Sequence, residues 1–209
     1  MYDINYEYLC ELKIKWYFIC GSRNMNALQK IIESKRTVFT MQNVAMLLGV
    51  ERDEKLSSLM HYYAKRGELQ NLRRGIYAKQ GYNVEEMACS IFKPSYISLE
   101  YVLARSGVVF QWDETITSVS YLSRTIEIDK TFYSYRKISH EIWGGYDGIE
   151  ICDNVYKATP ERAFLDMVYL SDGQCYFDNL HPLNKKEIKR LLPFYKSERL
   201  CKMVAQLLN

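Results

Sequence analysis

The side chains with the clearest chemical potential lie between residues 55 and 79, where positive charge is concentrated. This stretch holds six basic residues against a single acid, Glu68, so its formal charge is about +5, whereas the whole chain carries only +3. Lysine and arginine side chains that share one small surface neutralise the phosphates of nucleic acids. The charge pattern therefore predicts a binding surface for a polyanion, and double-stranded DNA is the expected one.

Sequence-specific DNA binding needs side chains that hold phosphate and side chains that reach the edges of bases. Small or planar hydrogen-bonding groups follow Lys55, and two arginines precede Gly75, where a hairpin tip would reach the minor groove. Two amides stand in the first turn of an expected helix, whose backbone N–H groups favour phosphate. The predicted DNA-contacting residues are Gln42, Asn43, Arg52, Lys55, Ser57, Ser58, His61, Tyr62, Lys65, Arg66, Arg73 and Arg74.

The elements that must position these side chains are readable from capping residues and periodicity. Thr40 is a natural N-cap for a helix that Gly49 ends, which leaves a tight corner before a second helix over residues 54–65. That second helix has apolar residues spaced i, i+3, i+4, i+7 and i+8 from Leu56. Short strands over 69–72 and 76–78 would form a hairpin. With a helix from about Asn24 and an extended piece at 38–39, this order predicts a winged helix-turn-helix over residues 24–80.

The remainder, residues 84–209, predicts a separate mixed α/β domain. Helices are expected over 84–92, from an N-cap at Ser98 to Gly107, and from Thr159 to Leu170, with two more around Pro193. Strands are expected near residues 108–112, 115–122, 124–128, 131–138 and 148–156. The fold class is therefore α+β. Residues 1–23 form an aromatic N-terminal extension of unassigned role.

Composition narrows the class of protein. With 48% apolar and 25% charged residues, the chain has the composition of an ordinary folded protein. The six cysteines are scattered, with no Cys-x-x-Cys pair and no histidine at metal-ligand spacing, so neither a metal site, a cofactor nor a disulfide framework is expected. We find no signal peptide and no apolar run of membrane-spanning length, which predicts a cytoplasmic protein without membrane contact.

Enzyme chemistry has little support in the sequence. His61, His140 and His181 are far apart, and no glycine-rich phosphate loop is present. The triplet Glu187-Ile188-Lys189 has the spacing of some nuclease cores, but it falls in a helical pattern. We therefore expect no enzymatic activity, with a nuclease-like effector as one alternative.

Four residues are the candidates for function in the second half of the chain. Arg162 and Asp166 are four apart in a helical pattern, so their side chains are able to pair on one helix face. A simple ion pair on the surface of a capped helix explains the same spacing equally well. The candidates are Ser98, Glu161, Arg162 and Asp166.

Three segments, in this order, resemble the AbiEi family of bacterial antitoxins, which belong to type IV toxin-antitoxin (abortive infection) systems. They are Leu72-Arg73-Arg74-Gly75-Ile76-Tyr77, then Pro94-Ser95-Tyr96-Ile97-Ser98 with a helix ending at Ser106-Gly107, and Ala158-Thr159-Pro160-Glu161-Arg162-Ala163-Phe164-Leu165-Asp166 followed by Val168-Tyr169-Leu170. The resemblance covers roughly Asn24 to Leu170.

This resemblance implies an N-terminal winged helix that binds inverted repeats in the promoter of its own operon. Whether protomers pair on that DNA is a separate question that the sequence leaves open. It also implies a C-terminal antitoxin domain that counteracts a nucleotidyltransferase-like toxin, usually encoded next door, without a required stable complex. The expected function is therefore transcriptional autorepression together with antitoxin activity. The alternative from another class is a protein-interaction module whose winged domain binds a protein partner.

Overall fold

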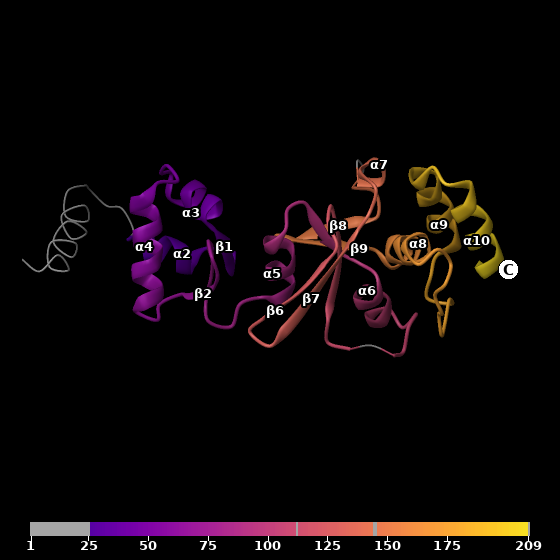
Figure 1. Ribbon diagram of the computed structural model, residues 1–209, viewed down its shortest axis with the longest axis horizontal. Coiled ribbons are helices and arrows are strands. Elements are labelled where there is room, and N and C mark those ends of the chain that lie inside the picture. The colour runs from indigo at the N-terminus through magenta and orange to yellow at the C-terminus, as the bar shows by residue number, and fades with distance from the viewer. Residues whose placement is uncertain (1–25, 112, 144–145, 209) are drawn as a thin grey trace, which may run out of the picture.

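We analysed a computed structural model, which describes residues 26–111, 113–143 and 146–208. The fold is mixed α+β, with helices arranged around two β-sheets (Figure 1). The expected N-terminal extension, residues 1–23, lies outside the described residues. No helix in the described ranges is both long and apolar enough to cross a membrane.

The first unit, residues 26–80, contains three helices and a small antiparallel sheet with strand order β1-β3-β2. A short helix and strand are followed by two helices and a hairpin, as predicted. The elements are α2 (Ala27–Glu33), β1 (Val38–Thr40), α3 (Met41–Leu48), α4 (Glu54–Lys65), β2 (Gln70–Arg73) and β3 (Ile76–Ala78).

The second unit, residues 84–208, is built on a six-stranded mixed sheet with the order β6-β7-β5-β4-β9-β8. Strand β4 pairs antiparallel with β5 and parallel with β9, so it lies in the interior of the sheet. The strands are β4 (Ser95–Ile97), β5 (Ile116–Ser120), β6 (Arg124–Ile128), β7 (Thr131–Lys137), β8 (Ile149–Cys152) and β9 (Val155–Ala158). The helices are α5 (Val84–Ile91), α6 (Glu100–Arg105), α7 (His140–Trp143), α8 (Pro160–Leu170), α9 (Lys185–Leu191), the 3-10 turn η1 (Leu192–Tyr195) and α10 (Glu198–Leu208).

Helices cover the six-stranded sheet on both faces, and strand alternation shows which helix lies on which. Ile97 pairs with Lys157, whose ammonium group reaches Glu85 on α5, so this face belongs to α5. The neighbouring residue of β4, Tyr96, points the other way and reaches Asp166 on α8. Figure 1 shows the resulting layers, with α5 on the side of the first unit and α6 and α8 to α10 on the other side.

Three expectations for the second unit were wrong, and one helix was missed. Residues 95–97 form a strand, so Ser98 does not cap a helix; the N-cap of α6 is Leu99, which has a φ of 62°. Residues 108–111 contain no strand. The single strand expected over 148–156 is a hairpin, since both residues at 153 and 154 adopt positive φ. The short helix α7 was not anticipated.

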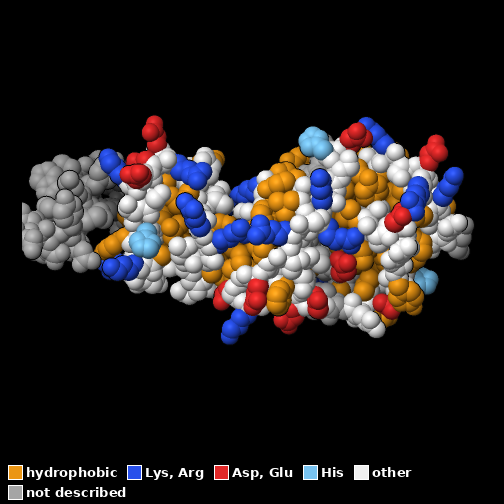
Figure 2. All heavy atoms as spheres, in the orientation of Figure 1, with side chains coloured by type: hydrophobic (Ala, Val, Ile, Leu, Met, Phe, Trp, Pro, Cys, Tyr) orange, Lys and Arg blue, Asp and Glu red, His pale blue; other side chains and the backbone are white. Residues whose placement is uncertain are grey.

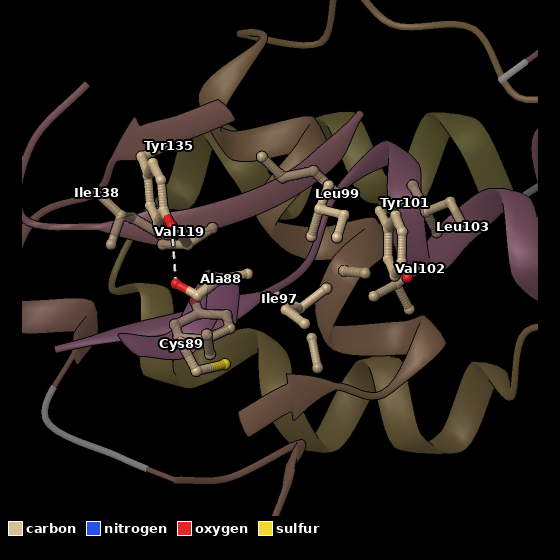
Figure 3. Close-up of a cluster of buried hydrophobic side chains, with 14 of the residues drawn as sticks. Ala88, Cys89, Ile97, Leu99, Tyr101, Val102, Leu103, Val119, Tyr135 and Ile138 are labelled. Carbon is tan, nitrogen blue, oxygen red and sulfur yellow. Dashed lines mark hydrogen bonds between the residues drawn. The ribbon is translucent and has the colours of Figure 1, made fainter. Parts of the chain in front are cut away.

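Two hydrophobic cores meet at the small sheet. Phe39 and Tyr77 join the core of the first unit, together with residues such as Val44 and Met60. Their strand neighbours Val38, Ile76 and Ala78 face the opposite way and belong to the larger core of the second unit. Figure 3 shows part of that larger core, including the hydrogen bond of 2.7 Å from the Tyr135 hydroxyl to the carbonyl of Ala88.

A buried carboxylate joins the two units. Glu86 on α5 is only 1% exposed, and one of its oxygens accepts hydrogen bonds from the Thr37 amide (2.8 Å), the Thr37 hydroxyl (2.6 Å) and the Val38 amide (3.3 Å). Its other oxygen forms an ion pair with Arg36 at 3.4 Å. The start of β1 is therefore held against the second unit by polar contacts as well as by the shared core.

Candidate nucleic-acid interface

The corner between α3 and α4 is fixed by side-chain caps. The Thr40 hydroxyl accepts a hydrogen bond from the backbone N–H of Asn43, and the side-chain oxygen of Asn43 accepts one from the backbone N–H of Thr40. Gly49 ends α3 with a φ of 69°, and Asp53 caps α4 by accepting from Leu56 at 2.8 Å. The Asn43 oxygen is thus used within the helix cap, which leaves only its NH₂ group for a ligand.

Helix α4 presents a polar face opposite its buried stripe. Leu56, Met60 and Tyr63 are buried against the first core. Among the predicted DNA-contacting residues, five on this helix are exposed: Lys55, Ser57, Ser58, His61 and Lys65. Ser57 also donates to the Asp53 carbonyl at 3.2 Å, so its hydroxyl oxygen keeps its acceptor capacity. The face therefore offers donors, acceptors and cations together.

Tyr62 and Arg66, at the end of α4, form a hydrogen bond with each other. An Arg66 nitrogen donates to the Tyr62 hydroxyl at 2.7 Å, and the same guanidinium forms an ion pair with Glu68 at 3.0 Å. The hydrogen bond to Tyr62, followed by the charge of Glu68, raises the pKa of Arg66. Any phosphate that bound Arg66 would compete with Glu68 for it.

The two arginines at the hairpin turn point into different surroundings. Arg73 is half-buried, and its guanidinium lies over the Phe92 ring of the second unit, 5.5 Å from the ring centroid. Arg74 is exposed in the turn itself, where Gly75 has a φ of 77°. The Gly75 carbonyl accepts from the Met41 amide at 3.2 Å, which places the turn beside the N-terminus of α3. Of the two, Arg74 is available to a ligand, and Arg73 is largely used between the units.

Not every lysine and arginine between residues 55 and 79 lies on an open surface. The Lys79 ammonium donates to the carbonyls of Ile32 and Ser34 and so caps the C-terminus of α2, and burial lowers its pKa. Among the basic residues predicted to contact DNA, four are exposed and form no ion pair with any described residue: Arg52, Lys55, Lys65 and Arg74. Gln42 is exposed in the first turn of α3. These side chains make up the open basic surface of the first unit.

The candidates of the second half of the chain form a buried polar network instead of a surface. Asp166 is fully buried, and one of its oxygens accepts from the Tyr96 hydroxyl (2.9 Å) and the Ser98 hydroxyl (2.8 Å). Its other oxygen accepts from the Tyr195 hydroxyl (2.6 Å) and from Arg162 (3.3 Å). The alternative of a surface ion pair is wrong, because the Arg162 side chain is 1% exposed and that of Asp166 is 0% exposed.

Desolvation and hydrogen bonding act in opposite directions on this network. Burial raises the pKa of Asp166, and the positive charge of Arg162 and three hydroxyl donors oppose that rise. Burial also raises the pKa values of Tyr96 and Tyr195, so both hydroxyls keep the protons that they donate. The remaining Arg162 donors reach the carbonyls of Asp147 and Ile142 at 3.3 Å. The network ties α8 to β4, α7 and η1.

Glu161 stands apart from that network. Glu161 is 9% exposed, and its carboxylate accepts a hydrogen bond from the Asn184 backbone amide at 3.0 Å, at the start of α9. It therefore fixes the segment that leads into α9. None of the four candidates presents a charged group to solvent.

Tyr96 and Tyr195 were missed by the sequence reasoning. Tyr96 stands two residues before Ser98, so recognising a strand over 95–97 would have placed both side chains on one face. Tyr195 follows Pro193 in a 3-10 turn, and no local pattern connects it with Asp166.

No group of three or more His, Cys, Asp or Glu side chains among the described residues is arranged to hold a metal ion. Glu187 pairs with Arg190 at 2.7 Å, on helix α9, and Lys189 is exposed. Burial raises the pKa of Cys89 to about 11, so this thiol is a poor nucleophile.

Comparisons with known proteins add no further constraint on these sites. No protein-family model matches the chain, and no curated protein matches it.

Proposed function

We propose that residues 26–80 are a winged helix-turn-helix that binds double-stranded DNA, and that the protein represses transcription from its own promoter. Helix α4 would enter the major groove, and the turn at Arg74 would be the wing. The order helix, strand, helix, helix, hairpin supports this assignment, as does the pairing of β1 with β3.

One observation carries the proposal: the exposed side of α4 combines Lys55 and Lys65 with Ser58 and His61, and none of the four is engaged by a side chain of the described residues. Cations placed near both ends of a helix suit two phosphate strands that flank a groove, and small polar groups between them suit base edges. Arg74 adds a further cation at the turn.

The wider charge distribution is compatible with a long nucleic-acid ligand. Figure 2 shows Lys and Arg side chains in a band that runs from the first unit across the middle of the molecule, with most of the acidic side chains of the six-stranded sheet region below it. A duplex held by α4 would meet further positive charge along this band, which raises affinity without adding sequence preference.

We further propose that the second unit acts as an antitoxin in the cytoplasm, against a nucleotidyltransferase-like toxin encoded nearby, without a stable complex and without enzymatic activity of its own. The resemblance of residues 94–107 and 158–170 to AbiEi proteins supports this. Most of the buried network around Asp166 comes from these segments, through Tyr96, Ser98 and Arg162. Because these side chains are buried, we infer that the surface that opposes the toxin lies elsewhere on the second unit.

The DNA-binding proposal is tested by titrating the protein with its upstream promoter and with scrambled DNA. We expect promoter-preferring binding that weakens about tenfold or more in the variant Lys55→Ala/Lys65→Ala/Arg74→Ala. The matched control is Lys185→Ala/Lys186→Ala/Lys189→Ala, which removes three exposed charges from α9. Equal loss in both variants, or no preference for the promoter, would refute the proposed site.

The antitoxin proposal is tested by growth of cells that express the neighbouring toxin gene. Residues 81–209 are not assumed to fold alone, so the full chain is used, in its wild-type form and as the triple α4 and turn variant. Both should restore growth. Failure of the wild-type chain to do so would refute the antitoxin role and leave the DNA-binding role intact.

A protein-binding role for the first unit has one observation in its favour. Met46 and Val50, at the end of α3, are 72% and 44% exposed, and such apolar side chains suit a protein contact. Replacing Met46 by Lys should leave DNA affinity unchanged or slightly raised if the proposal above is right.

A further inference from the structure

The two edges of the six-stranded sheet are unequally protected. Strand β6 closes one edge and carries the exposed charges Arg124 and Glu127. Strand β8 closes the other with the sequence Ile149-Glu150-Ile151-Cys152, and its last three residues are exposed. Charged side chains discourage pairing with further strands, and an apolar edge invites it. Strand β8 carries one exposed charge, Glu150, where β6 carries two, so the β8 edge is the better suited of the two to pairing.

Backbone geometry shows which groups of β8 are free to pair. A two-residue turn at Asp153 and Asn154 joins β8 to β9, so Cys152 and Val155 form the hydrogen-bonded pair beside the turn. The next pair, Ile151 and Tyr156, is then of the non-hydrogen-bonded kind. The N–H and C=O of Ile151 consequently point away from β9, toward the open edge.

The side chains next to this edge are also apolar and uncovered. Ile151 is 58% exposed and Tyr146 is 70% exposed. The Tyr146 ring lies 6.5 Å from the ring of Tyr156, the strand partner of Ile151. An exposed isoleucine and two neighbouring tyrosines beside free backbone groups form a small docking surface for an extended strand.

We propose that the occupant is a second copy of this chain, paired through β8 in antiparallel fashion about a two-fold axis. The strand is complementary to itself, and only one register satisfies it. With Ile151 opposite the partner's Ile151, the N–H of each isoleucine donates to the C=O of the other. Glu150 then faces the partner's Cys152. A shift toward residue 149 would place Glu150 opposite the partner's Glu150, where like charges repel.

The pairing is weak in the free protein. A four-residue strand buries far less than the roughly 1,200 Å² of a stable interface. Two copies held close together, for example on adjacent DNA sites, would pair far more readily because their effective concentration is high. The sheet edge alone carries this inference, so it does not rest on the DNA-binding proposal.

Disulfide trapping tests the proposed register. In a Cys201→Ser background, which removes another exposed thiol, Glu150→Cys should give a covalent dimer on mild oxidation of a concentrated sample. Mass spectrometry should place the bond between position 150 and the partner's Cys152. Within one chain these positions are about 6.5 Å apart along the strand, near the upper end of the usual disulfide range. A bond within one chain leaves a monomer on a denaturing gel, so only the covalent dimer counts as support.

Two further variants keep the test decisive. Glu150→Cys/Cys152→Ser should lose the cross-link in the proposed register and keep it in the shifted one. Glu127→Cys on β6 should stay monomeric, which controls for random collision. A dimer yield from Glu150→Cys no higher than that from Glu127→Cys, or a bond that survives Cys152→Ser, would overturn the proposal. Circular dichroism confirms that each variant is folded.

Discussion

Asp166 is a fully buried charged residue whose carboxylate is held entirely by neighbouring side chains. Its carboxylate receives three hydroxyl groups and one guanidinium while fully buried. Removing such an acceptor would leave the charge of Arg162 and the buried hydroxyls without a partner, and stranded buried charges cost more than the intact pair contributes. The residue is therefore best understood as a structural lock on α8.

Asp166→Ala is expected to lower the free energy of unfolding by about 3–5 kcal/mol, because it leaves the buried Arg162 guanidinium without its carboxylate partner. Urea denaturation measures the change. Arg199→Ala, which removes an exposed ion pair with Asp172, is the control and should change stability little. An Asp166→Ala protein as stable as wild type would show that the network is dispensable.

The raised pKa of Cys89 predicts how the stability of the fold responds to alkaline pH. Burial raises its pKa in the folded protein to about 11, above the ordinary value of 9.0, so the folded state holds the thiol proton where the unfolded state has lost it. Stability should therefore fall as pH rises from about 9 to 11. Buried tyrosines such as Tyr135 shift in the same direction, whereas Lys79 opposes the trend.

Urea midpoints measured at about pH 8 and about pH 10.5 test this dependence. Cys89→Ala should flatten the decline and leave part of it to the tyrosines. Stability that rises over this range, or a slope that Cys89→Ala leaves unchanged, would contradict the assignment.

At the scale of single residues, the sequence predicted which side chains pair better than it predicted how deeply they are buried. The spacing of Arg162 and Asp166 predicted that they pair, and they do. Spacing along a helix carries no information about burial, and so the sequence left a surface pair open. Burial comes from β4 and η1, whose residues lie 70 and 29 positions from Asp166 in the chain.

At the scale of elements, capping residues were reliable and short strands were not. Thr40 and Thr159 each cap the helix that the sequence assigned to them. Strand β4 is only three residues long and is buried on both faces, so it shows no alternation of polar and apolar residues. Serine and proline around it favoured a helix start, which is why Ser98 was misplaced.

Gly148 marks the close contact that fixes the turn before β8. A Cβ added there would lie 2.9 Å from both the Arg162 Cβ and a Leu191 methyl carbon, and its φ is 71°. Gly148→Ala should therefore destabilise the protein by about 2–4 kcal/mol, from steric overlap and backbone strain together.

The control for that substitution is Gly107→Ala. Gly107 has the same φ of 71° and no atom within 4 Å of its added Cβ, so only backbone strain of about 1 kcal/mol is expected. Chemical denaturation of both variants separates the two effects. If both variants lost the same free energy of unfolding, steric overlap at Gly148 would contribute nothing beyond backbone strain.

At the scale of the whole molecule, the small sheet belongs to both units. Alternation along β1 and β3 sends Phe39 and Tyr77 to one core and Val38, Ile76 and Ala78 to the other. The sequence marked a boundary near residues 81–83, and it gave no sign that the first unit buries a second face. Such a shared sheet couples the orientation of α4 to the six-stranded sheet.

Glu86→Ala should weaken this coupling. The substitution removes the acceptor for the Thr37 and Val38 amides, and unpaired buried donors cost about 1–3 kcal/mol each. Hydrogen exchange should show faster exchange at these amides, with α8 protected as before. Glu85→Ala, which removes the part-exposed pair with Lys157, is the matched control and should leave β1 unchanged.

The most direct test of DNA binding through α4 is the dependence of promoter affinity on salt concentration. Fluorescence anisotropy of wild type and Lys65→Ala over a salt series gives the slope of the logarithm of affinity against the logarithm of salt. We predict a steep negative slope for the wild type, reduced by about one in Lys65→Ala because one phosphate contact is lost. A slope near zero, or one that Lys65→Ala leaves unchanged, would contradict the account.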